Sequence, residues 1–163
     1  MGDGAGRHQD LTTRRTSRGV RSTWSHQERE RFDGHLERVL ATLPRAVHDF
    51  LDESPLIVDD APSDSMLRAM GLDLNEEDLC GMHTGVALTE RSVTHSGELP
   101  DVIQIFRRGI LDAAGGWTEC RDENGEEYGG VARIEREIRI TILHEIGHHF
   151  GLSESDLERL GYG

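Results

Sequence analysis

The segment HEIGHHFGLSESD, from His144 to Asp156, holds histidines and acids at spacings that suit metal chemistry. His144 and His148 are four residues apart, so on a helix both imidazoles lie on one face and can bind one ion. Glu145 lies about 100° round the helix from His144, where it can contact a water on the ion without binding the ion. Two nitrogen ligands and a general base on neighbouring turns form the HExxH pattern, which predicts a zinc site.

A catalytic zinc usually has three protein ligands and a water, so the chain should supply a third donor. Glu154 fits the spacing best, because Gly151 allows a sharp reversal after His148 and the carboxylate follows three residues later. Asp156 is the alternative, although it can instead serve as the N3 acid of a capping box that begins at Ser153. We therefore favour Glu154 as the third ligand and leave Asp156 open as the alternative.

The other histidines and the cysteines have no such support. His149 points away from the ligand face by about 100°, so we expect it to pack or to support the site rather than to bind this ion. Cys120, His83 and His95 are distant in sequence, and no spacing links them to the motif. Cys80 and Cys120 form no CxxC pair, which favours buried free thiols over a disulfide or a metal clip.

A long helix over residues 131–151 is predicted to carry the motif. Its apolar side should be buried, and consists of Ile142, Leu143, Ile146 and Phe150. Gly147 leaves room on the helix surface for another element to approach, and Gly151 suits the left-handed position that ends a helix. A last short helix over residues 153–161 should follow and stop at Gly161.

The N-terminal part of the folded region also predicts helix. Ser25 and Glu28 form a capping box, in which each side chain satisfies the backbone N–H of the other residue. An apolar stripe at spacings of three and four follows, made of Phe32, Leu36, Val39, Leu43, Val47 and Phe50. Pro44 falls inside this stripe, so the helix should kink there or a second helix should start.

Short strands are expected between these helices. Residues 101–106, DVIQIF, form the best strand pattern, and residues 56–58 and 85–93 also fit strands. Residues 66–74 fit a helical turn, and the Gly- and acid-rich residues 115–130 fit a loop. This order predicts an α+β fold in which a short mixed sheet packs against an N-terminal helix and the HExxH helix.

Composition bounds the class of protein. The chain has 163 residues and is 35% hydrophobic, which suits one domain over residues 23–163 after a disordered, arginine-rich arm over residues 1–22. A net charge of −13 argues against nucleic-acid binding, which needs a cationic face. No apolar run approaches the roughly 18 residues that cross a bilayer, and no secretory signal is visible. We expect a cytoplasmic monomer with no membrane partner.

The C-terminal sequence HEIGHHFGLSESDLERLGY resembles the signature of the minimal zincin-like metallopeptidases of bacteria. The segments LATLPRAVHDFL, LIVDDAPSDS, GMHTGVALTERSV and LPDVIQIFRRGI occur in the family's order, so the resemblance covers about residues 25–162. It implies a small zincin-like domain, Zn²⁺ as cofactor and a peptide or protein substrate. Glu145 would assist the attack of a zinc-bound water on a peptide bond. The family is similar to those with an aspartate as third ligand, and Glu154 is one methylene longer.

Two other functions stay open. The protein could bind zinc as a regulatory or interaction module with little or no peptidase activity, because no methionine follows Met82 to form the methionine turn of metzincins. A deformylase-like zinc hydrolase is disfavoured, because Cys120 in WTECRDENG does not match the cysteine motif of deformylases. For a peptidase, residues 101–106 or 85–93 could form the edge strand along which a substrate lies.

Overall fold

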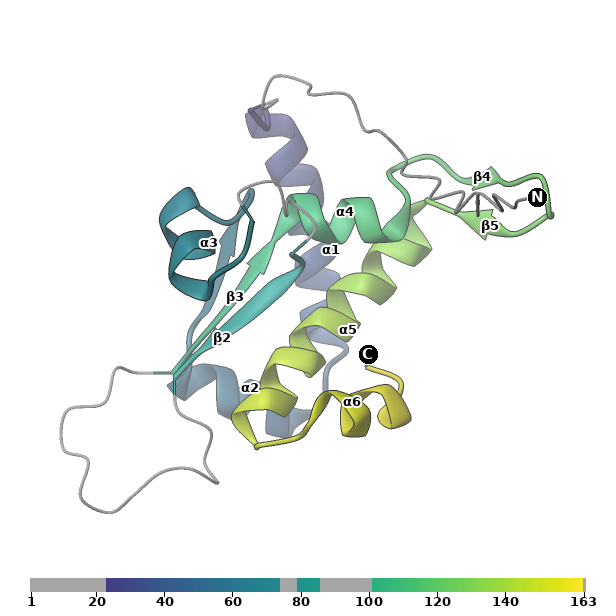
Figure 1. The fold of residues 1–163 in the computed structure, drawn as a ribbon. Helices are drawn as coiled ribbons and strands as arrows, with labels where there is room; N and C mark the ends of the chain where they lie inside the picture. Colours follow the sequence, from purple (N-terminus) through teal and green to yellow (C-terminus); the bar gives the residue numbers. More distant parts are fainter. Residues whose placement is uncertain (1–22, 74–78, 86–100, 163) are drawn as a thin grey trace, which may run out of the picture.

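The computed structural model describes residues 23–73, 79–85 and 101–162, and its elements form an α+β fold (Figure 1). Predicted segments that fall elsewhere, including the arm over residues 1–22 and nearly all of the strand expected over residues 85–93, lie outside the described residues. The elements in chain order are α1 (His26–Ala41), α2 (Arg45–Glu53), β1 (Leu56–Asp59), α3 (Asp64–Met70), β2 (Gly81–Thr84), β3 (Val102–Phe106), α4 (Arg107–Ala114), β4 (Cys120–Arg121), β5 (Glu127–Tyr128), α5 (Val131–His149) and α6 (Glu154–Leu160).

The main sheet is short and mixed, as predicted. Its strand order is β1-β3-β2, with β1 parallel and β2 antiparallel to β3. In β3 the side chains of Ile103 and Ile105 are fully buried, which explains why DVIQIF is the strongest strand pattern in the chain. Residues 101–106 were one of two candidates for the edge strand, and the central place of β3 rules them out, because β3 is paired on both sides.

Helix α5 carries a continuous apolar stripe into the core of the fold. It contacts α1, α4, β2 and β3, and Figure 1 shows it running diagonally past the sheet toward α6. Its buried stripe repeats every four residues and consists of Ile134, Ile138, Ile142 and Ile146. This stripe joins the predicted apolar residues of α1 and the start of α2 in one core. Phe150 departs from the expectation of burial, because the chain reverses at the helix end and leaves it 50% exposed.

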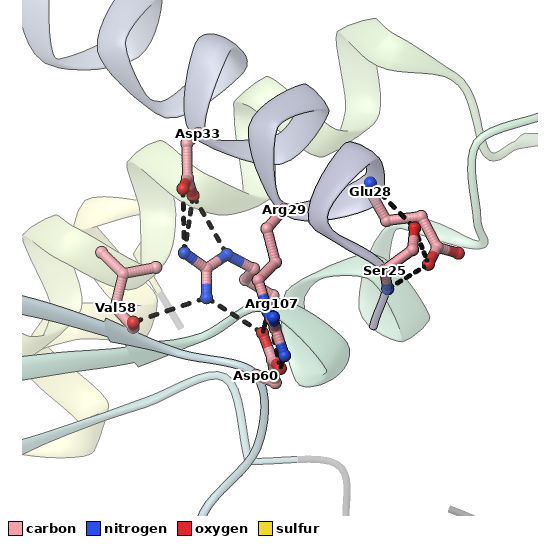
Figure 2. Close-up of polar contacts among 7 residues, drawn as sticks. All are labelled: Ser25, Glu28, Arg29, Asp33, Val58, Asp60 and Arg107. Carbon is pink, nitrogen blue, oxygen red and sulfur yellow. Dashed lines mark hydrogen bonds and ion pairs between the residues drawn. The ribbon is translucent and has the colours of Figure 1, made fainter. Parts of the chain in front are cut away.

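The predicted helix starts at the N-terminal side are confirmed. Ser25 caps α1 in a reciprocal capping box with Glu28, which is drawn at the right of Figure 2. Pro44 starts a second helix rather than kinking the first: α1 ends at Ala41, and α2 begins directly after the proline. A proline suits this place because its missing N–H would have no partner within the first turn of a helix.

Several parts of the fold differ from the expectations. Of the helical turn expected over residues 66–74, residues 66–70 belong to α3, which begins earlier, after the N-cap Ser63. The expected loop over residues 115–130 contains the β4–β5 hairpin, which extends from the body beyond the start of α5 (Figure 1). Helix α4 follows β3 without a break and was not expected, because it has no capping side chain to mark its start. Neither cysteine forms a disulfide, as expected, but Cys80 is half-buried and Cys120 is exposed, where buried thiols were expected.

Arg107, at the junction of β3 and α4, connects the sheet to α1 through buried charge (Figure 2). Its guanidinium donates to both carboxylate oxygens of Asp33 on α1 at 2.8–3.0 Å, and to Asp60 after β1 at 3.0 Å. Asp60 also accepts hydrogen bonds from Arg29 at 2.6–3.1 Å. The buried cation therefore neutralises two acids from different elements, which fixes α1 over the end of the sheet.

None of the helices among the described residues is long and apolar enough to cross a membrane.

Replacing Arg107 by Met should lower the free energy of unfolding by on the order of 1–3 kcal/mol, because the partly exposed Asp33 and Asp60 would lose the buried cation that they share. Chemical denaturation measures the change. Arg45→Ala is the matched control: its ion pair with Asp49 is exposed, so the expected change is within about 0.5 kcal/mol. Equal losses in the two variants would contradict this role of Arg107.

The same cluster predicts a pH dependence of stability. Hydrogen bonds from Arg29, and the charges of Arg29 and Arg107, lower the pKa of Asp60 in the folded protein. The stabilisation is therefore complete above the unfolded-state pKa of about 3.9 and is lost as the pH falls through the folded-state pKa. The difference in unfolding free energy between wild type and Asp60→Asn should be constant from neutral pH down to about pH 5 and then narrow. A difference that does not narrow in acid would contradict the assignment.

Candidate metal centre

The chain reverses sharply at the end of α5, as the glycine predicts. Gly151 has φ 79°, in the left-handed region, and its N–H donates to the carbonyl of His148 at 2.9 Å. The N–H of Leu152 donates to the carbonyl of Gly147 at 3.0 Å. These two bonds form a Schellman motif, which closes the helix and turns the chain back along it. Helix α6 begins shortly afterwards, capped by Ser153.

A close contact holds α6 against α5. A Cβ on Gly147 would lie 2.4 Å from Cδ2 of Leu157, a side chain that is completely buried. The absent side chain at position 147 therefore lets α6 approach the last turn of α5, as the sequence predicts. This approach brings the start of α6 next to the face of α5 that carries His144 and His148.

His144, His148 and Glu154 come together at this face. The two Nε2 atoms are 3.0 Å apart, and the Glu154 carboxylate lies 3.0 Å from Nε2 of His148 and 3.5 Å from Nε2 of His144. One donor atom from each of the three residues lies within 4.8 Å of the others. Glu154 is exposed, so the group opens to solvent on one side.

The backbone carbonyl of Tyr162 fixes the orientation of one imidazole. It lies 2.5 Å from Nδ1 of His144 and can only accept a hydrogen bond. The proton of His144 is therefore held on Nδ1, and Nε2 presents its lone pair toward His148 and Glu154. Metal-binding histidines in proteins are commonly held in this way by a carbonyl or carboxylate on the second ring nitrogen.

Asp156, the alternative third donor, is engaged elsewhere. Its carboxylate accepts from the N–H of Ser153 at 3.1 Å and from the Ser153 hydroxyl at 2.7 Å. These hydrogen bonds, with a smaller contribution from Arg159, lower the pKa of Asp156. The side chain thus completes the capping box of α6, and the geometry favours Glu154 over Asp156 beside the histidines.

Glu145 lies between α5 and the edge strand β2. The side chain is 7% exposed, and β2 approaches it closely because Gly81 has no Cβ: one placed there would lie 3.1 Å from Cγ of Glu145. Burial raises the pKa of Glu145 to about 7, while the charge of His144 and a hydrogen bond from the backbone of His83 act in the opposite direction. A carboxyl group with such a pKa can exchange a proton with water near neutral pH.

The donor set fits zinc. Tetrahedral Zn²⁺ with bonds of about 2.0–2.1 Å places its ligand atoms roughly 3.3–3.5 Å apart, and the distances among His144, His148 and Glu154 are 3.0, 3.0 and 3.5 Å. Two of the three distances lie about 0.3 Å below this range and one lies at its upper end, so binding an ion needs only a small outward shift of the side chains. Two imidazole nitrogens and one carboxylate are also the donor types of many catalytic zinc sites, which keep one position open for water. Cys120 is remote from this group, on the hairpin beyond the other end of α5 (Figure 1), so the geometry gives no support to a cysteine ligand.

The structure places His149 away from these donors, as expected, but in a second group of titratable side chains. His149, the last residue of α5, lies with His83 of β2 and with Asp101, which precedes β3. Sequence reasoning missed this group because its members come from three elements with no common spacing. The sequence offers one weak signal for the group: His83 and Asp101 lie at or next to strand patterns.

A comparison with known protein families covers the residues of this site. The family model described as zincin-like metallopeptidase matches residues 51–163, which is more than half of the chain. The chain therefore belongs to the zincin-like metallopeptidase family, and the resemblance noted in the sequence is confirmed over residues 51–163. A search among curated proteins finds no match.

Gly147→Ala should destabilise the protein by about 1–3 kcal/mol, because the added methyl collides with Leu157 and pushes α6 from α5. Glu154 would move with α6, so zinc affinity should fall by about tenfold or more. Gly34→Ala on α1 is the matched control, since nothing lies within 4 Å of its added Cβ. That change should leave zinc affinity unchanged and raise stability slightly. Thermal unfolding measures the stability of each variant, and zinc titration measures its affinity. Identical behaviour of the two variants would contradict the proposed packing constraint.

Proposed function

We propose that this member of the zincin-like metallopeptidase family is a zinc-dependent hydrolase of peptide bonds. The observation that carries the proposal is the meeting of His144, His148 and Glu154 at distances that suit one ion, with the buried Glu145 on the same helix turn. Family membership supports the peptidase class, and the donor set supports zinc as the metal. The expectations of a monomer and of a cytoplasmic location stay predictions.

In this proposal His144, His148 and Glu154 hold Zn²⁺, which when bound would polarise the substrate carbonyl and acidify a water. The Tyr162 carbonyl accepts from Nδ1 of His144, so in the neutral ring the lone pair lies on Nε2 and is ready for the ion. The Glu154 carboxylate makes the site less positive than three neutral imidazoles would. The acidifying effect on water should therefore be weaker than in a site built from three histidines.

Glu145 is the proposed general base and acid. Its carboxylate takes a proton from the attacking water as the oxygen adds to the carbonyl carbon of the substrate. It then gives this proton to the amide nitrogen as the carbon–nitrogen bond breaks, so one water is consumed and a carboxylic acid and an amine are released. The position of Glu145, one residue after His144, keeps it near the donors without directing it at the ion.

The substrate is proposed to bind as an added strand along β2. Among the described residues this strand is an edge of the sheet, and it packs against α5 over Glu145. An extended peptide can hydrogen-bond to the outer side of an edge strand, which aligns its backbone independently of sequence. The acidic body of the protein would favour basic or neutral peptides over acidic ones.

A zinc-binding interaction module is the second candidate. The observation that favours it is the burial of Glu145, which is 7% exposed beneath β2 and accepts a backbone hydrogen bond there. A base in this position reaches a water only if β2 and α5 leave room for one when the ion is bound. Incubation of the zinc-loaded protein with a diverse peptide library separates the two candidates. Cleavage supports the peptidase, and intact peptides at all positions support the module.

Glu145→Gln should retain zinc and lower peptide hydrolysis by about 100-fold or more, because the amide cannot accept the proton of the attacking water. His144→Ala and His148→Ala should each lose the zinc of this site, because two donors are too few to hold it. Glu158→Gln, at an exposed place on α6, is the control and should change neither property. Metal analysis and a peptide cleavage assay measure these outcomes; full activity in Glu145→Gln would contradict the proposed base.

A further inference from the structure

A second group of potential metal ligands lies on another side of the last turn of α5, about 100° round the helix from His148. His149 follows His148 directly, so its side chain leaves the helix in a different direction and meets His83 from β2. The two rings lie edge to face with their centroids 5.5 Å apart. The Asp101 carboxylate lies 3.3 Å from Nε2 of His83 through one oxygen and 3.4 Å from Nδ1 of His149 through the other.

This group is buried, unlike the first. The side chains of His83, Asp101 and His149 are 8%, 9% and 7% exposed, and Phe50 covers His149 with ring centroids 4.7 Å apart. Within the described part of the chain, neither Nε2 of His83 nor Nδ1 of His149 makes a hydrogen bond, although both atoms are inaccessible to water. Buried polar atoms are nearly always satisfied, so two unsatisfied ring nitrogens aimed at the same carboxylate indicate a missing partner.

The spacing suits an ion rather than direct hydrogen bonds. The distances of 3.3 and 3.4 Å are longer than a charge-assisted hydrogen bond, which is about 2.7–2.9 Å. They match the roughly 3.3–3.5 Å that separates the ligand atoms of tetrahedral zinc. One donor atom from each of the three residues lies within 4.8 Å of the others, as in the first group.

We propose that His83, Asp101 and His149 form a second site for a divalent transition-metal ion, with Zn²⁺ as the fitting occupant. Two imidazoles and one carboxylate supply nitrogen and oxygen donors of the type that zinc accepts. The ion would satisfy both ring nitrogens and would be partly neutralised by Asp101, which reduces the cost of placing its charge in a buried region.

The second site connects the edge strand to the zinc helix. His83 belongs to β2, Asp101 precedes β3 and His149 ends α5, so one ion would tie three elements together. The backbone of His83 also donates a hydrogen bond to Glu145. The ion would therefore hold β2 in the position that buries Glu145, and its role is structural rather than catalytic. This inference does not need the first site to be active.

Metal stoichiometry of the full-length protein tests the proposal. The protein is loaded with Zn²⁺, freed of loosely bound metal by gel filtration and analysed by mass spectrometry of the metal. Wild type should carry two equivalents, and the double variant His144→Ala/His148→Ala should retain one. His83→Phe and Asp101→Asn should each retain one as well, because the first group is left intact. His35→Phe is the matched control, since His35 is buried but hydrogen-bonds to Glu135 outside both groups, and should retain two.

A second measurement distinguishes the loss of a metal ion from a failure of the variant to fold. Thermal unfolding of His144→Ala/His148→Ala should shift upward on addition of Zn²⁺, and the further change His83→Phe should remove this shift. Titration of wild type with Co²⁺ should give visible absorption bands that rise to two equivalents. One equivalent in wild type, lost in His144→Ala/His148→Ala, would overturn the second site and leave the proposed function standing. One equivalent lost only in His83→Phe would overturn the first site and support the second.

Discussion

The constraint on which the rest of the site depends is the reversal of the chain at Gly151. A helix alone can present His144 and His148 on one face, but it cannot return a carboxylate to that face. The left-handed glycine, the two hydrogen bonds of the helix end and the close contact at Gly147 together bring α6 back along α5. Glu154 reaches the histidines only because this return is tight, so a local backbone requirement determines the composition of the donor set.

The last turns of α5 serve packing and chemistry at once. The isoleucine stripe of this helix is buried in the core, which fixes the rotation of the helix about its axis. Once that rotation is fixed, the remaining directions are fixed too: His144 and His148 face α6, Glu145 faces β2, and His149 faces the start of β3. Burial then gives the neighbouring groups different properties, since Glu145 is desolvated while Glu154 remains exposed. The different exposure of Glu145 and Glu154 is thus a consequence of how the isoleucine stripe of α5 packs in the core.

Sequence reasoning succeeded where a feature is local. Capping boxes at Ser25 and Ser153, the helix start after Pro44 and the glycine end of α5 each involve residues a few positions apart, and all are present in the structure. The proximity of Glu154 to the histidines could be predicted for the same reason. The strand DVIQIF was found by its residue types, but its central place in the sheet was not, because pairing partners lie far away in sequence.

The features that sequence reasoning missed depend on long-range contacts or lack a local signal. Helix α4 starts without a capping side chain, and its first residue, Arg107, is instead held by acids from two other elements. His83 and Asp101 meet His149 only after the sheet has formed against α5, so no spacing along the chain could indicate the group. Such convergence is a property of the tertiary fold.

The most direct test of the central claim is a crystal structure of the zinc-loaded protein with anomalous diffraction recorded at the zinc absorption edge. The account predicts an anomalous peak about 2.0–2.2 Å from Nε2 of His144, Nε2 of His148 and a carboxylate oxygen of Glu154. A map with no peak at this place, or a peak whose third protein ligand is Asp156 rather than Glu154, would contradict it.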